Sequence, residues 1–128
     1  NLNPKGIKAC DCVVRALCYA MDKEWDEVYR DLCVLGCKMK RMPNEKQVYE
    51  RYLEQQGWTK HKQPRDVLNK KYTVKEFLDE YMPGGNMCII SVANHLTCAR
   101  YDEMEQYTLA DTWDCSYKCV GNYWMFDN

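Results

Sequence analysis

Residues 87–101 read MCIISVANHLTCARY, and this stretch decides the class of fold. The run from Met87 to Ala93 is apolar and has the length of one buried strand. His95 to Tyr101 continues as a second strand, joined to the first by a tight turn near Asn94. Two further stretches with strand character follow, at Tyr107 to Ala110 and at Tyr117 to Phe126. The C-terminal part of the chain is therefore predicted to form an antiparallel sheet.

The N-terminal part has helical periodicity instead. After Asp11, apolar residues recur at spacings of three and four, which places them on one helical face. Further helices are predicted from Asp22 to about Gly36, from Asn44 to Gly57 and from Thr73 to Pro83, with Asp11, Asp22, Asn44 and Thr73 as their capping residues. Helices followed by a sheet predict an α+β domain in which the N-terminal helices pack on the C-terminal antiparallel sheet.

Composition limits the classes of function. The chain of 128 residues has the size of one domain, and we expect residues 1–128 to form a single unit. A formal net charge of −1 gives no electrostatic footprint for nucleic acid or for an anionic membrane. No apolar stretch approaches the roughly 20 residues of a membrane span. The nine cysteines, an odd number, favour reduced thiols in the cytoplasm over a secreted disulfide framework.

Cys12 is the strongest candidate nucleophile because it begins a predicted helix. The free amides and the dipole at a helix start stabilise a thiolate, which is the reactive form of cysteine. Asp11 is predicted to be the N-cap, with its carboxylate accepting from the amides of the first turn. Cys10 lies just outside the same helix and is the nearest alternative nucleophile.

His95 and Asp111 are the candidates for activating that thiol. Hydrolysis by a thiolate needs an imidazole to carry the proton and an acceptor to orient the imidazole. His95 begins a strand, whereas the other histidine, His61, lies in a polar segment and is predicted to be exposed. Asp111 ends the strand that is expected to pair with the His95 strand, and Asp114 is the alternative acceptor.

Three short motifs resemble the papain-like cysteine peptidases. They are DCVVRAL at residues 11–17, HLT at 95–97 and DTWD at 111–114. Their order and spacing are similar to those of small papain-like proteins of bacteria and phages, and of bacteriocin-processing peptidase domains. The resemblance implies a helix with the nucleophile packed on a sheet that carries the histidine and the aspartate. It further implies hydrolysis of a peptide or isopeptide bond in a peptide or protein substrate through a thioester, without a metal or other cofactor.

One position departs from the family pattern. Papain-like enzymes usually have a glutamine about six residues before the cysteine, and its amide helps to bind the oxyanion. Gly6 occupies that position here. Asn3 from the same loop, or the backbone amide of Cys12, is expected to bind the oxyanion instead. Trp113 lies between the two candidate acids and is expected to line the substrate groove.

Two other classes of function stay open on the sequence. A non-catalytic papain-like binding or inhibitor protein, encoded by a phage, would keep the fold without the chemistry. A zinc module would gather thiols from three places: Cys10 and Cys12, Cys33 and Cys37, and Cys115 and Cys119. None of these pairs has the two-residue spacing of a zinc knuckle. Cys33 and Cys37 also fit one helix face as core residues, and the last pair flanks a turn where exposure is expected.

Overall fold

The computed structural model describes residues 11–81, 87–101, 107–111 and 114–126 of the chain. The helices in this part are α1 (Cys12–Met21), α2 (Trp25–Met39), α3 (Lys46–Gln55) and α4 (Val74–Glu76), which continues as the π-helical segment η1 (Phe77–Tyr81). The strands are β1 (Trp58–His61), β2 (Met87–Val92), β3 (His95–Tyr101), β4 (Tyr107–Leu109) and β5 (Tyr123–Phe126). The predicted α+β class, with the main helices in the N-terminal part, is confirmed.

The strands form one antiparallel sheet in the order β1–β5–β2–β3–β4. β2 and β3 form the predicted hairpin, in which Val92 pairs with His95. Asn94, the second residue of the turn, adopts the left-handed conformation with φ 56°, which asparagine tolerates well. His95 therefore follows the turn directly and lies at the end of the sheet.

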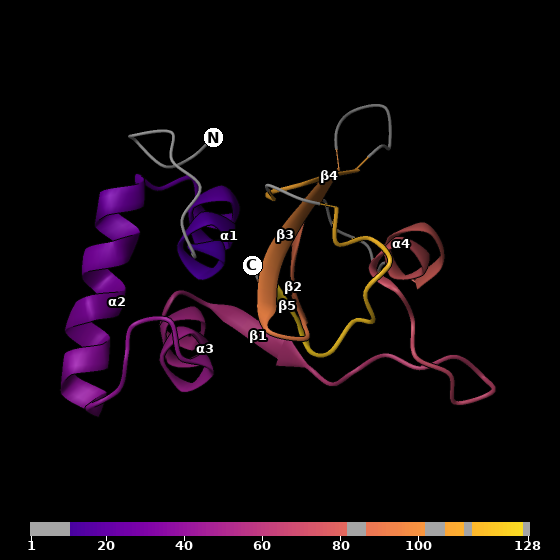
Figure 1. The fold of residues 1–128 in the computed structure, drawn as a ribbon, viewed down its shortest axis with the longest axis horizontal. Helices are drawn as coiled ribbons and strands as arrows, with labels where there is room; N and C mark the ends of the chain where they lie inside the picture. Colours follow the sequence, from indigo (N-terminus) through magenta and orange to yellow (C-terminus); the bar gives the residue numbers. More distant parts are fainter. Residues whose placement is uncertain (1–10, 82–86, 102–106, 112–113, 127–128) are drawn as a thin grey trace.

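The sheet separates two apolar cores (Figure 1). Helices α1 and α3 cover one face, with α2 packed on their outer side, and α4 with η1 covers the other face. Successive side chains of a strand point to opposite faces, so Ile89 enters the core under the three helices and Ile90 enters the core under α4. Because both faces of β2 are buried, its sequence is apolar at successive positions rather than alternating, with Ser91 as the one polar residue.

The packing of α1 on β3 positions the start of α1 against the sheet. Leu17 is fully buried, and Leu96 and Cys98 of β3 belong to the same core. Further along the pair, Arg100 donates a hydrogen bond from Nη2 to the Tyr19 carbonyl at 2.6 Å, and its guanidinium lies 4.5 Å from the centre of the Tyr19 ring. These contacts fix α1 along β3.

Both predicted ends of α2 are wrong. Asp22 does not begin α2 but ends α1 in the left-handed conformation, and Glu24 is the residue before α2. α2 also runs past Gly36 to Met39. Gly36 does not end the helix but lets the backbone at Arg41 pass close to it. A Cβ at this position would lie 2.7 Å from the Arg41 carbonyl oxygen.

The predicted capping boxes have opposite outcomes. Glu45, not Asn44, precedes α3, and its carboxylate accepts from the Met42 amide at 2.6 Å, so the predicted box at α3 is wrong. The box at α4 is confirmed. Thr73 Oγ1 accepts from the Glu76 amide at 3.2 Å, and Glu76 Oε1 accepts from the Thr73 amide at 3.0 Å.

The last predicted strand is shorter than expected, since β5 begins only at Tyr123. Residues 118–120 pair with the start of α4, whereas Gly121 and Asn122 still hydrogen-bond to Ser91 of β2. The Lys118 carbonyl accepts from the Val74 amide at 2.8 Å, and the Val120 amide donates to the Tyr72 carbonyl at 2.8 Å. This segment therefore holds α4 beside the sheet.

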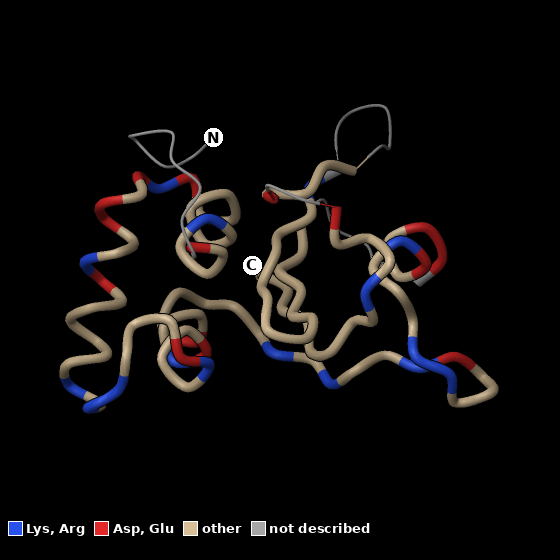
Figure 2. The backbone as a smooth tube through the Cα atoms, viewed as in Figure 1, with Lys and Arg blue, Asp and Glu red and all other residues tan. Residues whose placement is uncertain are grey.

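Charged residues at the two ends of α2 have the signs that the helix dipole favours (Figure 2). Asp26 and Glu27 lie in the first turn and Lys38 in the last, where each sign is favoured. Lys40 and Arg41 beyond the helix are exposed, as expected of a solvated helix end. Within the described residues, no helix combines the length and the apolar character needed to cross a membrane.

Leu17→Ala is expected to lower the free energy of unfolding by about 2 to 5 kcal/mol, because it leaves a cavity between α1 and the sheet. Val34→Ala is the control on α2, where the side chain is 57% exposed, and it should change that free energy by less than about 0.5 kcal/mol. Urea denaturation followed by circular dichroism measures both. Similar effects of the two substitutions would contradict the packing of α1 on the sheet.

Candidate active site

Cys12 is the first residue of α1, as predicted, and Asp11 occupies the N-cap position. The Asp11 carboxylate does not cap the helix, contrary to the prediction. It is buried, pairs with Arg15 at 2.8 Å and accepts a hydrogen bond from Trp25 Nε1 of α2 at 3.0 Å. The first-turn amides are therefore not engaged by this carboxylate and can stabilise a negative charge on the Cys12 sulfur.

His95 and Asp111 lie together at the end of the sheet. His95 Nε2 is 2.6 Å from Asp111 Oδ1, and the two side chains are 8% and 4% exposed. Asp111 comes directly after Ala110, whose amide donates to the Cys98 carbonyl of β3 at 3.0 Å and so prolongs the pairing of β3 with β4. Asp114, the alternative acceptor, is exposed and accepts from the Ser116 amide.

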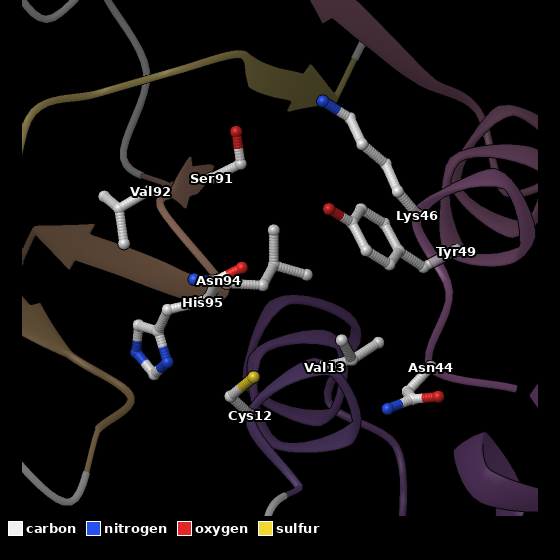
Figure 3. Close-up of a pocket in the computed structure, with 10 residues that line it drawn as sticks. Cys12, Val13, Asn44, Lys46, Tyr49, Ser91, Val92, Asn94 and His95 are labelled. Atoms are coloured by element: carbon white, nitrogen blue, oxygen red, sulfur yellow. The ribbon is translucent and has the colours of Figure 1, made fainter.

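The Cys12 sulfur and the His95 ring face each other (Figure 3). One ring nitrogen points toward the sulfur and the other points away from it. Because Nε2 is engaged by Asp111, the nitrogen that faces Cys12 is Nδ1. The structure thus brings the three predicted residues Cys12, His95 and Asp111 into one row, with the imidazole in the middle.

The surroundings of Cys12 favour its thiolate. Burial raises the pKa of the thiol, but the hydrogen bond to His95 and the Leu96 amide outweigh burial and bring the pKa below its ordinary value. Other buried thiols show the opposite behaviour. Burial raises the pKa of Cys18 to about 11 and that of Cys98 to about 12.

His95 and Asp111 stabilise each other in their charged forms. Burial lowers the pKa of His95, but the hydrogen bonds to Asp111 and to two thiols raise it well above the ordinary histidine value. Burial raises the pKa of Asp111, and the hydrogen bonds from His95 and from its other neighbours bring it below its ordinary value. The site therefore favours a carboxylate, an imidazolium and a thiolate side by side.

Cys115 is a member of this cluster that the sequence did not indicate. It was predicted to be exposed beside a turn, but it is fully buried, and its Sγ donates to Asp111 Oδ2 at 3.0 Å. Thr97, the next residue on the His95 face of β3, is also fully buried and contributes to the low pKa of Asp111. The sequence places Cys115 four residues after Asp111, but this spacing alone does not show that the thiol points inward. The hydrogen bonds between its turn and the start of α4 bring it there.

A cleft of about 450 Å³ opens beside Cys12 and His95 (Figure 3). Lys46 and Tyr49 of α3 line it on one side and Ser91 of β2 on another, together with residues of the turn between β2 and β3. The volume is in the range of ligand sites. The thiol and the imidazole thus border a space large enough for part of a substrate.

Two predicted site residues lie outside the described part of the chain, and two other side chains differ from their predicted exposure. Asn3, the predicted oxyanion donor, and Trp113, predicted to line the groove, lie outside the described residues. His61 was predicted to be exposed, but it is half-buried and stacks on Tyr123 with 4.8 Å between the ring centres. Cys37, expected in the core, is exposed on the outer side of α2.

A metal ion could be held by His95, Asp111 and Cys115, because one ligand atom from each lies within 4.8 Å of the others. The separation of 2.6 Å between the imidazole and the carboxylate is that of a direct hydrogen bond. Two ligands at about 2.0 Å from a tetrahedral zinc ion would lie roughly 3.3 Å apart. His95 and Asp111 are therefore arranged as a hydrogen-bonded pair and not as two ligands of a zinc ion. The group of His95, Asp111 and Cys115 also differs from the cluster of cysteines that the zinc hypothesis requires.

Comparison with family models, with curated proteins and with solved structures finds no match to this chain. The chemistry of the site therefore has to be inferred from its own geometry. A thiol of low pKa, an imidazole that can hold its proton, and a buried carboxylate behind the imidazole are the three parts of nucleophilic catalysis by cysteine. Their common position beside a cleft makes this the candidate active site.

Replacement of Cys12 by serine isolates the contribution of His95 to stability. The folded chain raises the pKa of His95, so its stabilisation is fully present below the ordinary value of about 6.5 and is lost as the pH rises toward the folded-state value. In Cys12→Ser, the free energy of unfolding should fall above about pH 6.5, by up to about 1.4 kcal/mol per pH unit. Cys12→Ser/His95→Asn should lack this fall. Urea denaturation across the pH range measures both variants, and equal slopes would contradict the raised pKa.

Proposed function

We propose that this chain is a papain-like cysteine hydrolase that cleaves a peptide or isopeptide bond in a peptide or protein substrate. The observation that carries the proposal is the row of Cys12, His95 and Asp111, in which the thiol at a helix start has a lowered pKa. The order of elements agrees with the family resemblance, since a helix that begins with the thiol packs on an antiparallel sheet that bears the imidazole and the carboxylate.

In the proposed first step, the Cys12 thiolate attacks the carbonyl carbon of the scissile bond and a carbon–sulfur bond forms. The resulting oxyanion accepts hydrogen bonds from amides at the start of α1, with the Cys12 amide as the main candidate. His95 then gives the proton on Nδ1 to the leaving amine, and the carbon–nitrogen bond breaks. The product of this step is a thioester on Cys12 and a free amine.

In the second step, water is the nucleophile. His95 takes a proton from the water molecule through Nδ1 as the oxygen attacks the thioester carbonyl. The carbon–sulfur bond breaks, and the acid product leaves while Cys12 returns to the thiolate. Throughout, Asp111 holds Nε2 and keeps the ring turned toward the sulfur, as the aspartate of a catalytic triad does.

The state of the other cysteines supports a reducing compartment, for which we propose the cytoplasm. The described cysteines are all free thiols, and several of them are core residues, such as Cys88 and Cys98. Free thiols persist where glutathione and thioredoxin keep them reduced. A catalytic thiolate requires the same condition, because oxidation would remove the nucleophile.

The proposal is tested with p-nitrophenyl acetate, whose acetyl group any reactive thiolate can accept. The wild-type chain should form an acetyl thioester on Cys12, seen by peptide mass mapping, and should release p-nitrophenol repeatedly as water regenerates the thiolate. Cys12→Ala should abolish the modification, and His95→Ala should slow turnover by about 10² to 10⁴. Cys18→Ala is the matched control in the same helix and should keep wild-type turnover, because the pKa of Cys18 is raised to about 11.

Alkylation by iodoacetamide separates this proposal from its alternatives. In a hydrolase, Cys12 should react well below pH 8, and His95→Ala should slow the reaction at pH 6. An ordinary thiol profile, with no acetylation of Cys12, would support a non-catalytic papain-like binding protein instead. Stoichiometric zinc in the purified chain by elemental analysis would support the zinc module.

A further inference from the structure

The Asp111 carboxylate has two oxygens, and each has a different side-chain neighbour. Oδ1 is 2.6 Å from His95 Nε2, and Oδ2 accepts from Cys115 Sγ at 3.0 Å. A carboxylate held at one oxygen can still rotate about its Cβ–Cγ bond, whereas a donor at each oxygen fixes its plane. The second donor therefore determines how well the first oxygen is aimed at the imidazole.

Cys115 differs from the other fully buried thiols of the chain. Cys88 and Cys98 belong to the apolar cores on the two sides of the sheet, and their sulfurs make long contacts of 3.6 and 3.9 Å with the carbonyl of the following residue. Cys115 belongs to neither core, and its sulfur donates to the Asp111 carboxylate and lies beside the His95 ring. Its burial thus serves a polar contact rather than apolar packing.

The backbone around Cys115 is held in place by α4. The Lys118 amide donates to the Cys115 carbonyl at 3.0 Å, which closes the turn. The turn then accepts two hydrogen bonds from the start of α4, from Lys75 to the Ser116 carbonyl at 2.9 Å and from Val74 to the Lys118 carbonyl at 2.8 Å. The thiol is therefore presented by a rigid support and not by a free loop.

We propose that Cys115 is a positioning residue, which donates its S–H to Asp111 Oδ2 and thereby holds Oδ1 on His95. Its effect on the Cys12–His95 pair rests on the proposed function, whereas its effect on His95 itself does not. The thiol donates to Asp111, since a thiolate beside the carboxylate would be repelled. Burial and the neighbouring Asp111 raise the pKa of Cys115 and outweigh the hydrogen bond with His95, which lowers it, so the sulfur stays protonated.

Three variants test this proposal. Cys115→Ala removes the donor, Cys115→Ser restores a donor of similar size, and Cys98→Ala removes a fully buried thiol of the apolar core under the N-terminal helices. The first readout is the titration of the His95 ring by NMR. The chain has only two histidines, so His61 is the internal reference and its titration should not change. The second readout is the rate of Cys12 alkylation by iodoacetamide at pH 6.

In Cys115→Ala we expect a lower His95 pKa and a Cys12 alkylation roughly three to ten times slower, which is the effect of about one hydrogen bond. The effect is partial because Thr97 still lies beside Asp111. Cys115→Ser should recover both values, and Cys98→Ala should match the wild type in both. If Cys115→Ala does not fold, Cys115→Val fills the same space without a donor and gives the same comparison.

Failure of the positioning role of Cys115 can be distinguished from failure of the proposed hydrolase function. An unchanged His95 titration in Cys115→Ala or Cys115→Val would overturn the positioning role, whatever the reactivity of Cys12. The same would follow if Cys98→Ala lowered the His95 pKa as much as Cys115→Ala did. By contrast, a fall in the His95 pKa in Cys115→Ala that Cys115→Ser reverses would support the positioning role. It would do so even if Cys12 reacted like an ordinary thiol, because that reactivity would overturn only the proposed hydrolase.

Discussion

The packing of α1 on β3 is the constraint on which the candidate site depends. The thiol comes from the first residue of the helix and the imidazole from the first residue of the strand, so neither element can shift without separating them. The buried contacts of Leu17 with its core and of Arg100 with Tyr19 lie further along the two elements. The distance between the two reactive groups is thus set by contacts further along α1 and β3 that take no part in the chemistry.

The Asp11 side chain contributes to the site because it does not cap the first turn of α1. A carboxylate that capped the first turn would place a negative charge beside the sulfur and would oppose a thiolate. Asp11 instead pairs with Arg15 and accepts from Trp25, which neutralises its charge and ties the start of α1 to α2. The helix start keeps its positive character for Cys12, and the position of that start is fixed by a second helix.

How much of this could be predicted from the sequence depends on the range of the interactions involved. The turn at Asn94 and the capping box at Thr73 follow from neighbouring residues, and both were predicted correctly. The pairing of His95 with Asp111 could be predicted because a single short connection joins their strands. The burial of Cys115 could not, since it depends on hydrogen bonds between its turn and the start of α4, about 40 residues earlier. The same reason applies to the Asp11 side chain, whose partner Trp25 lies on another helix.

The energetics of the cluster favour a chemical role over a structural one. Burying an imidazolium and a carboxylate costs desolvation energy that their mutual attraction only partly offsets, and well-packed apolar side chains at such positions are often as stable or more so. Here the charged pair of His95 and Asp111 is buried at the end of a sheet whose two cores are already complete without it. Its second neighbour, Cys12, is half-buried and borders a cleft, where a ligand can reach the sulfur. A buried charge pair that leads to an accessible thiol fits the proposed proton transfer at that sulfur, whereas stability alone does not require it.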